Sequence, residues 1–163
     1  MDKDPSLNVL GGALTLCSTD PITGYFRDGA CNTCAADNGS HTVCAVMTAE
    51  FLAFSKYVGN DLSTSRPEFG FVGLKDGDGW CLCASRFLQA HDEGCAPKVN
   101  LAATHQRALE IVPLDVLQQH TTTGCGRIDI SKVCFAPILR IFCNATNVRL
   151  DCAHNETVSS RSG

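Results

Sequence analysis

The stretch HTVCAVM, from His41 to Met47, decides the fold, and Thr48 follows it directly. Its β-branched and apolar residues predict a buried strand. Thr48 is a typical helix N-cap, and Glu50 places a negative charge in the first turn, where the helix dipole favours it. Gly59 is expected to end this helix, which therefore spans 49–58. The segment predicts a strand that leads straight into a helix.

A second strand is predicted at WCLC, from Trp80 to Cys83, after the turn-rich segment 75–79. Side chains of a strand alternate between its two faces, so Cys81 and Cys83 are expected to share one face. A helix over 85–93 is expected to follow and to end at Gly94. This part of the chain therefore predicts a second strand–helix unit that carries two thiols on one side.

The other segments up to residue 120 alternate short predicted elements with long loops. Segment 8–17 predicts a strand interrupted by a glycine pair, and the Asp-, Gly- and Asn-rich segment 18–40 predicts a long irregular loop. Further along, the sequence predicts a second polar loop, two short strands and a helix started by a proline, over 60–71, 99–103, 108–112 and 113–120. This irregular order predicts an α+β fold, a compact two-layer domain with a small sheet, short helices and long irregular loops.

Length and composition favour one domain with a tail. The chain has 163 residues, of which 44% are hydrophobic, enough for one buried core. We expect a polar leader over 1–6, a single α+β domain over 7–120 and a C-terminal appendage of uncertain structure over 121–163. The appendage has a cysteine every nine residues, at Cys125, Cys134, Cys143 and Cys152. This spacing points neighbouring thiols to opposite sides of a helix or a strand, so it matches no zinc module.

Charge and hydropathy exclude several classes of partner. The net charge is -4 and basic residues are scattered, which argues against nucleic-acid binding. The sequence contains no run of about twenty apolar residues, so no membrane span is expected. No signal peptide is recognised, which predicts a cytoplasmic protein, or one from an organelle interior if an N-terminal extension is missing. The remaining expected partner is a small-molecule ligand, and the sequence predicts no particular oligomeric state.

The 11 cysteines are an odd number without a secretion signal, which predicts reduced thiols rather than a disulfide framework. Thiolate and imidazole are the ligands that zinc and iron prefer. The predicted metal ligands are His41, Cys44, Cys81 and Cys83, which are expected near the two strands, and the alternates are Cys17 and Cys31. The sequence therefore predicts a metal- or ligand-binding domain, with zinc or iron as its cofactor and an enzymatic role left open.

Two other interpretations of the cysteines stay open. Cysteine is often a small buried hydrophobe, so the thiols are also compatible with a non-enzymatic interaction or assembly module whose cysteines pack in the core. Alternatively, the chain is a thiol redox protein, with Cys31 or Cys34 as the exposed reactive member. A single CxxC outside a thioredoxin-like pattern supports that role only weakly.

Polar residues of the two long loops are the candidates for ligand binding, because loops on a rigid scaffold often carry function. They are Arg27, Asp28, Asn60 and Arg66. The candidates for catalysis are His41, His105 and Asp61, where histidine suits general base chemistry. Asp and Asn also form turns by bonding their own backbone, which is the alternative for the loop carboxylates and amide.

Several ordered blocks of the sequence resemble one family. The blocks are NVLGG (8–12), CSTDPITG (17–24), RDG (27–29), GSHTVCAVM (39–47), GNDLS (59–63), WCLC (80–83) and ATH (103–105). Over about residues 7–120 the chain is similar to domain-of-unknown-function family 2237. The resemblance implies a small α+β fold and brings no established activity. Cys34 stands where the family is expected to have glycine, which argues against a required metal knuckle of Cys31 and Cys34.

Overall fold

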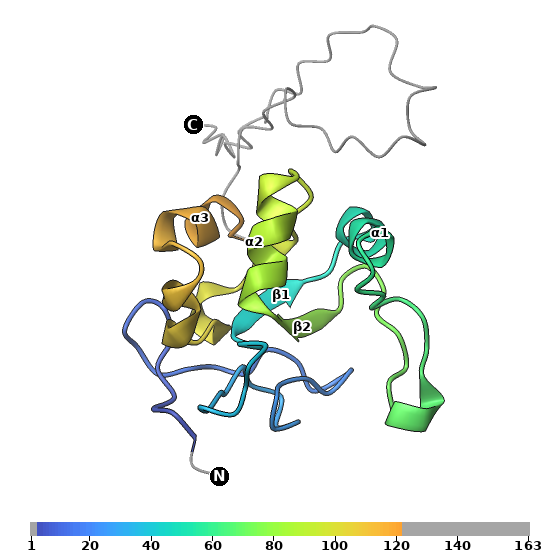
Figure 1. The fold of residues 1–163 in the computed structure, drawn as a ribbon. Helices are drawn as coiled ribbons and strands as arrows, with labels where there is room; N and C mark the ends of the chain where they lie inside the picture. Colours follow the sequence, from blue (N-terminus) through green and yellow to red (C-terminus); the bar gives the residue numbers. More distant parts are fainter. Residues whose placement is uncertain (1–2, 122–163) are drawn as a thin grey trace, which may run out of the picture.

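A computed structural model describes residues 3–121 of the chain (Figure 1). Its sheet consists of β1 (Val43–Val46), β2 (Gly79–Leu82) and β3 (Lys98–Val99), in the order β2-β1-β3. Both pairings are antiparallel, and Cys44 lies opposite Cys81 in the register of β1 and β2. The strand predicted within His41–Met47 is therefore the middle strand of the sheet.

Three short α-helices accompany the sheet: α1 (Ala49–Tyr57), α2 (Ala84–Asp92) and α3 (Leu114–Gln119). Three 3-10 turns complete the regular structure, η1 (Pro67–Phe69), η2 (Leu101–Ala103) and η3 (Gln106–Glu110). In Figure 1 the helices lie on one side of the sheet and the N-terminal segments, drawn in blue, lie on the other. The predicted α+β class, with a small sheet and short helices, is confirmed.

The two faces of the sheet belong to different clusters of buried residues, because successive side chains of a strand point to opposite faces. Val43, Ala45 and Leu82 belong to the main apolar core, with Phe51 of α1 and Phe87 of α2. The other face carries a second, smaller cluster that contains Cys44, Cys81, Cys31 and Ala103, with Cys17 packed against it. The sulfur atoms of Cys17, Cys31, Cys44 and Cys81 thus lie on the side of the sheet away from the helices.

Thr48 caps α1 as predicted, since its Oγ1 accepts a hydrogen bond from Phe51 N at 3.1 Å. Replacing Thr48 by alanine removes this acceptor and leaves a helix N–H without a protein partner. We expect Thr48→Ala to lower the free energy of unfolding by about 1 kcal/mol, measured by urea denaturation. Thr48→Ser keeps the hydroxyl and is the matched control. Equal losses in the two variants would contradict a capping role.

Three predicted strands differ from the structure because side chains bond the backbone locally. Segment 8–17 forms a tight loop, in which Asn8 Oδ1 accepts from the N–H groups of Leu10 and Gly12 at 3.0 Å. The strand predicted over 99–103 ends early, because Asn100 Oδ1 accepts from Ala102 N at 3.1 Å and starts η2. The strand predicted over 108–112 is replaced by η3.

The bounds of α1, α2 and α3 agree with the predicted helices within one or two residues. No regular element interrupts residues 18–40, as expected for that loop. Within residues 3–121, no helix is long and apolar enough to cross a membrane. Nearly all of the predicted appendage, with Cys125, Cys134, Cys143 and Cys152, lies outside the described residues.

Candidate functional site

Four cysteines meet on the face of the sheet that the helices leave uncovered. Cys44 and Cys81 come from neighbouring strands, while Cys17 and Cys31 come from the long N-terminal loops. They form two disulfides, Cys17–Cys44 with a Cα–Cα distance of 5.6 Å and Cys31–Cys81 with 5.3 Å. Such Cα separations are ordinary for disulfides. The prediction that these thiols are reduced is therefore wrong for the structure described.

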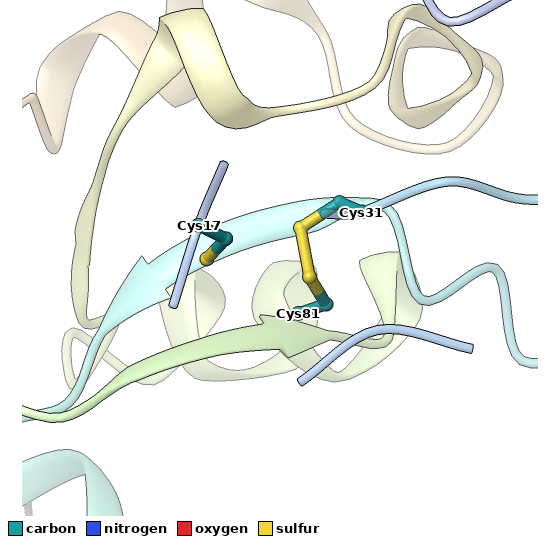
Figure 2. A group of neighbouring side chains, drawn as sticks. All are labelled: Cys17, Cys31 and Cys81. Atoms are coloured by element: carbon teal, nitrogen blue, oxygen red, sulfur yellow. A yellow bond between two sulfur atoms is a disulfide. The ribbon is translucent and has the colours of Figure 1, made fainter. Parts of the chain in front are cut away.

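The two disulfides lie next to each other. The sulfur atoms of Cys17, Cys31 and Cys81 all lie within 4.8 Å of one another, and Figure 2 shows Cys17 beside the Cys31–Cys81 bond. Cys31, Cys44 and Cys81 are at most 2% exposed, and Cys17 is half-buried. A group of three cysteines at these distances could hold a metal ion.

Hydrogen bonds fix the loop that brings Cys31 to the sheet. The buried Thr23 hydroxyl accepts from Cys81 N at 2.8 Å, which satisfies a backbone donor on the outer edge of β2. Cys17 N donates to Gly29 O at 2.8 Å. Asp28 accepts from Ala30 N at 3.2 Å and from Asn32 Nδ2 at 2.8 Å. The loop is therefore held along β2 by groups on both sides of the disulfide.

Cys83 does not share the face of Cys81, which corrects the predicted alternation. The strand ends at Leu82, and Cys83 is the N-cap residue of α2. The chain turns there because Ala84 N donates to Ser40 O at 2.9 Å instead of continuing the strand ladder. Cys83 is partly exposed and forms no disulfide with any of the described cysteines. The predicted ligand set is thus divided between two places.

Cys83 lies beside His41, and His41 is held by Asp37. His41 Nδ1 is 2.6 Å from Asp37 Oδ1, and His41 N donates to Asp37 Oδ2 at 2.9 Å. Thr33 Oγ1 donates to the same Oδ2 at 2.9 Å, and the Asp37 side chain is fully buried. Although burial alone would raise it, the pKa of Asp37 is lowered by these hydrogen bonds and by the charge of His41.

The environment of His41 favours its protonated form. A hydrogen bond with the Cys83 side chain is the largest cause, burial opposes it, and the Asp37 bond adds to it, so the pKa of His41 is raised to about 9. Nδ1 is occupied by Asp37, which leaves Nε2 directed away from that carboxylate. The Tyr25 ring stacks on the imidazole at 6.2 Å between centroids. The three residues Cys83, His41 and Asp37 are called the triad below.

A cavity of about 280 Å³ opens over the triad. Its walls come from the long loop, from the segment after α1 and from β2, as the residues Gly24, Tyr25, Arg27, His41, Asn60, Leu62, Trp80, Cys81, Leu82 and Cys83 show. Cys81 belongs both to this wall and to the four-cysteine cluster. The cavity therefore adjoins the cluster and contains two of the triad residues.

Of the predicted ligand-binding residues, Arg27 and Asn60 line this cavity and Asp28 and Arg66 do not. Asp28 has a turn role, and Lys3 Nζ lies 2.7 Å from its carboxylate. Its pKa is lowered because hydrogen bonds from Lys3, Asn32 and Ala30 N outweigh its burial. Arg66 lies 3.8 Å from the exposed carboxylate of Glu68.

The other two catalytic candidates have structural contacts. Asp61 accepts hydrogen bonds from Ser63 and Thr64, which lower the pKa of its carboxyl, as in an Asx turn. His105 is 1% exposed, with Nε2 3.0 Å from Pro5 O and Nδ1 accepting from Arg107 N at 3.1 Å. Burial lowers the pKa of His105. Both ring nitrogens of His105 are therefore engaged by the backbone.

The sequence prediction missed Asp37. The available signal was its position four residues before His41 in a segment without helical pattern, where a carboxylate and an imidazole can meet only through a turn. That turn contains Ser40 with a φ of 48°. It also contains Gly39, where an added Cβ would lie 2.6 Å from His41 Cε1, so the imidazole packs directly on the glycine backbone.

Fold and site together define a small α+β domain with a four-cysteine cluster on one face of its sheet and an adjoining cavity that contains a histidine–cysteine pair. The family model described as "Uncharacterized protein conserved in bacteria (DUF2237)" matches residues 7–121, and the chain belongs to this family. The resemblance expected over about 7–120 is thereby confirmed. No curated protein is significantly similar to the chain.

Proposed function

We propose that the four-cysteine cluster binds one zinc or ferrous iron ion when its disulfides are reduced. The observation that carries the proposal is the mutual distance of at most 4.8 Å between the sulfur atoms of Cys17, Cys31 and Cys81. Cys44 supplies the fourth sulfur, since it is bonded to Cys17. Two disulfides that only cross-link the chain can lie anywhere in the fold. Four thiolates that bind one ion must have their sulfur atoms close together.

The sulfur positions suit a tetrahedral thiolate site. Zinc–sulfur bonds of about 2.3 Å place the four sulfurs about 3.8 Å apart. Opening the two disulfides would move the bonded sulfur atoms apart toward this distance. The sulfur atom of Cys17 already lies within 4.8 Å of those of Cys31 and Cys81. Two ligands come from paired strands and two from loops, so the sheet would fix half of the site and the loops could adjust. Iron takes the same tetrahedral arrangement of thiolates.

The chemistry balances with a dithiol reductant. Each disulfide takes two electrons and two protons from one dithiol, which becomes a disulfide in turn. The four resulting thiols lose four protons when they bind a divalent cation as thiolates. Metal uptake by this site should therefore release protons and require reducing conditions.

The two alternative functions predicted from the sequence, an interaction or assembly module and a thiol redox protein, give these cysteines different roles. If the cluster only stabilises the fold, the disulfides act as cross-links of an interaction or assembly module. If it is a redox device, the bonds open and close without any metal. Cys31 and Cys34 are both at most 1% exposed, which argues against either as an exposed redox thiol. His41 and Cys83 are not among the proposed ligands, because both line the cavity and neither belongs to the four-cysteine cluster.

We expect the full chain, purified without a metal-chelating tag, to bind zinc or iron stoichiometrically after reduction and to bind almost none when oxidised. Replacing Cys31 and Cys81 together by alanine should abolish this binding, because two ligands cannot hold the ion tightly. Elemental analysis after gel filtration measures the metal. Alanine is preferred to serine because it places no unpartnered hydroxyl in the buried site.

The matched control replaces Cys125 and Cys134, which removes the same number of thiols from the predicted appendage. This control should keep the metal, provided that the cluster is the binding site. A reduced wild-type chain without metal would contradict the proposal. Equal loss of metal in the two double variants would contradict it as well, and circular dichroism of both variants shows whether they remain folded.

A further inference from the structure

We propose that Cys83 is the nucleophile of a catalytic site in which His41 transfers protons and Asp37 positions His41, and that its substrates are small carbonyl compounds carrying a carboxylate. This activity is separate from metal binding, because Cys83 lies outside the four-cysteine cluster. It follows from three features of the structure: a positioned histidine, a thiol next to it, and a cavity that reaches both.

The first feature is a histidine with a fixed orientation. Asp37 is completely buried and accepts from three donors, the imidazole and backbone N–H of His41 and the hydroxyl of Thr33. A carboxylate bonded to Nδ1 sets the ring orientation and directs Nε2 outward. Gly39 lets the ring pack against the backbone, and Tyr25 stacks on the ring. The carboxylate therefore acts through His41 and is a positioning residue.

The second feature is the place of the thiol. Cys83 is the N-cap residue of α2, a helix of nine residues, and lines the same cavity as His41. A carbonyl compound bound in that cavity can therefore reach the thiol and the imidazole together. Nucleophile, base and orienting carboxylate in hydrogen-bonded sequence are the arrangement that activates cysteine in acyl transfer. His105, bonded only to backbone, shows the contrast within this chain.

The third feature is the cavity, which defines the substrate class. Arg27 lies in its wall, with Nη1 3.3 Å from Ile22 O and the guanidinium 5.3 Å from the Trp80 ring centroid. No Asp or Glu within residues 3–121 forms an ion pair with Arg27, whereas Lys3 pairs with Asp28. Guanidinium groups bind carboxylates in a bidentate manner. A volume of about 280 Å³ suits a small molecule.

The reaction is an acyl transfer to water. Cys83 Sγ attacks the substrate carbonyl carbon, so a carbon–sulfur bond forms and the bond to the leaving group breaks. The one proton that Cys83 and His41 share passes through His41 to the leaving group. A water molecule then attacks the thioester, with His41 taking its proton, and the carbon–sulfur bond breaks to release a carboxylic acid. The proton on His41 restores the starting state, so the net reaction consumes one water and changes no oxidation state.

The test uses two electrophiles that differ only in charge, iodoacetate and iodoacetamide, on the oxidised full chain with metal removed. Under these conditions the four cluster cysteines are held in disulfides and do not alkylate. Peptide mass spectrometry assigns the label to individual cysteines, which separates Cys83 from every other cysteine of the chain. We expect Cys83 to react about 10²-fold faster than the same cysteine in denatured protein. It should also favour iodoacetate over iodoacetamide more than the denatured chain does.

Variants separate the roles of the cavity residues. His41→Gln should bring the alkylation rate of Cys83 down to that of the denatured chain. Arg27→Gln should lower the rate with iodoacetate more than the rate with iodoacetamide, and so reduce the preference for iodoacetate without removing the part that comes from His41. Arg66→Gln removes the same charge outside the cavity and is the matched control, with no effect on either rate. Circular dichroism confirms that each variant is folded.

Acyl transfer itself is tested with the 4-nitrophenyl monoester of succinate, which carries a carboxylate, and with 4-nitrophenyl acetate. The expected result is a stoichiometric burst of nitrophenolate from the succinate ester, a thioester on Cys83, and slow turnover. Absence of this burst in Cys83→Ser supports the assignment. A wild-type Cys83 that reacts no faster than denatured protein overturns the proposal, and so does a burst that survives in Cys83→Ser. Neither result depends on whether the reduced cluster binds metal.

Discussion

A chain in which Cys31 and Cys81 are both alanine should unfold with a free energy about 4 kcal/mol lower than the oxidised wild type. The Cys31–Cys81 disulfide joins residues separated by 50 positions, so removing it frees a long loop in the unfolded chain. That freedom stabilises the unfolded ensemble, which is the main way in which a disulfide acts. Because total stabilities are about 5–15 kcal/mol, this loss is large.

Guanidinium denaturation with a chelator present measures the change without any contribution from a metal. A dithiol reductant should destabilise the wild type strongly and the double variant less, since one of its two cross-links is already absent. The matched comparison is the variant with alanine at Cys17 and Cys44, whose bond spans 27 positions and should contribute slightly less. If the Cys31→Ala, Cys81→Ala variant were as stable as the oxidised wild type, the cross-link would have no part in stability.

The strand β1 and the helix α1 could be predicted from the sequence because the residues that determine them lie within or next to each element. β-Branched residues between Val43 and Val46, the cap at Thr48 and the glycine at position 59 act within a few residues of themselves. The same holds for the helix that starts after Pro113. Where the prediction was wrong, a side chain had a backbone partner nearby, as Asn8 and Asn100 have. Propensity rules predict that asparagine favours loops, but they do not predict which backbone groups its side chain will bond or what shape the loop will take.

The candidate site depended on contacts between distant segments, and these decided which thiols meet. The helix after Cys83 begins one residue earlier than predicted, with Ala84 N bonded to the distant carbonyl of Ser40. That single position moves Cys83 from the face of Cys81 to the cavity of His41. Cys44 and Cys81 meet because of strand register, which the spacing of cysteines does not encode. Pattern reasoning therefore grouped Cys83 with Cys44 and Cys81, whereas the structure places Cys83 outside their cluster.

Asp37→Asn should slow alkylation of Cys83 at neutral pH about 10²-fold, because the amide cannot stabilise the imidazolium of His41 as a carboxylate does. The effect on pH dependence is more diagnostic. In the wild type, where the pKa of His41 is raised to about 9, the preference of Cys83 for iodoacetate should fall as the pH rises through that value. The charge on Arg27 persists at this pH, so the change reports His41.

Removing the Asp37 carboxylate lowers the pKa of His41, since a negative neighbour favours the protonated ring. The fall in iodoacetate preference should therefore occur at lower pH in Asp37→Asn than in the wild type. A raised pKa also means that His41 contributes stability that is complete below its unfolded value of about 6.5 and is lost as the pH rises through about 9. Asp37→Asn should weaken this alkaline loss of stability.

Thr33→Val is the matched control, because it removes one hydrogen bond to Asp37 and keeps the carboxylate beside His41. A loss of packing or of loop order alone would reduce the alkylation rate in both variants without moving the midpoint of the pH profile. A midpoint that shifts in Asp37→Asn and stays in Thr33→Val assigns the shift to the carboxylate charge. An unshifted midpoint in Asp37→Asn would mean that His41 receives its proton affinity from Cys83 alone, and that Asp37 only maintains the turn.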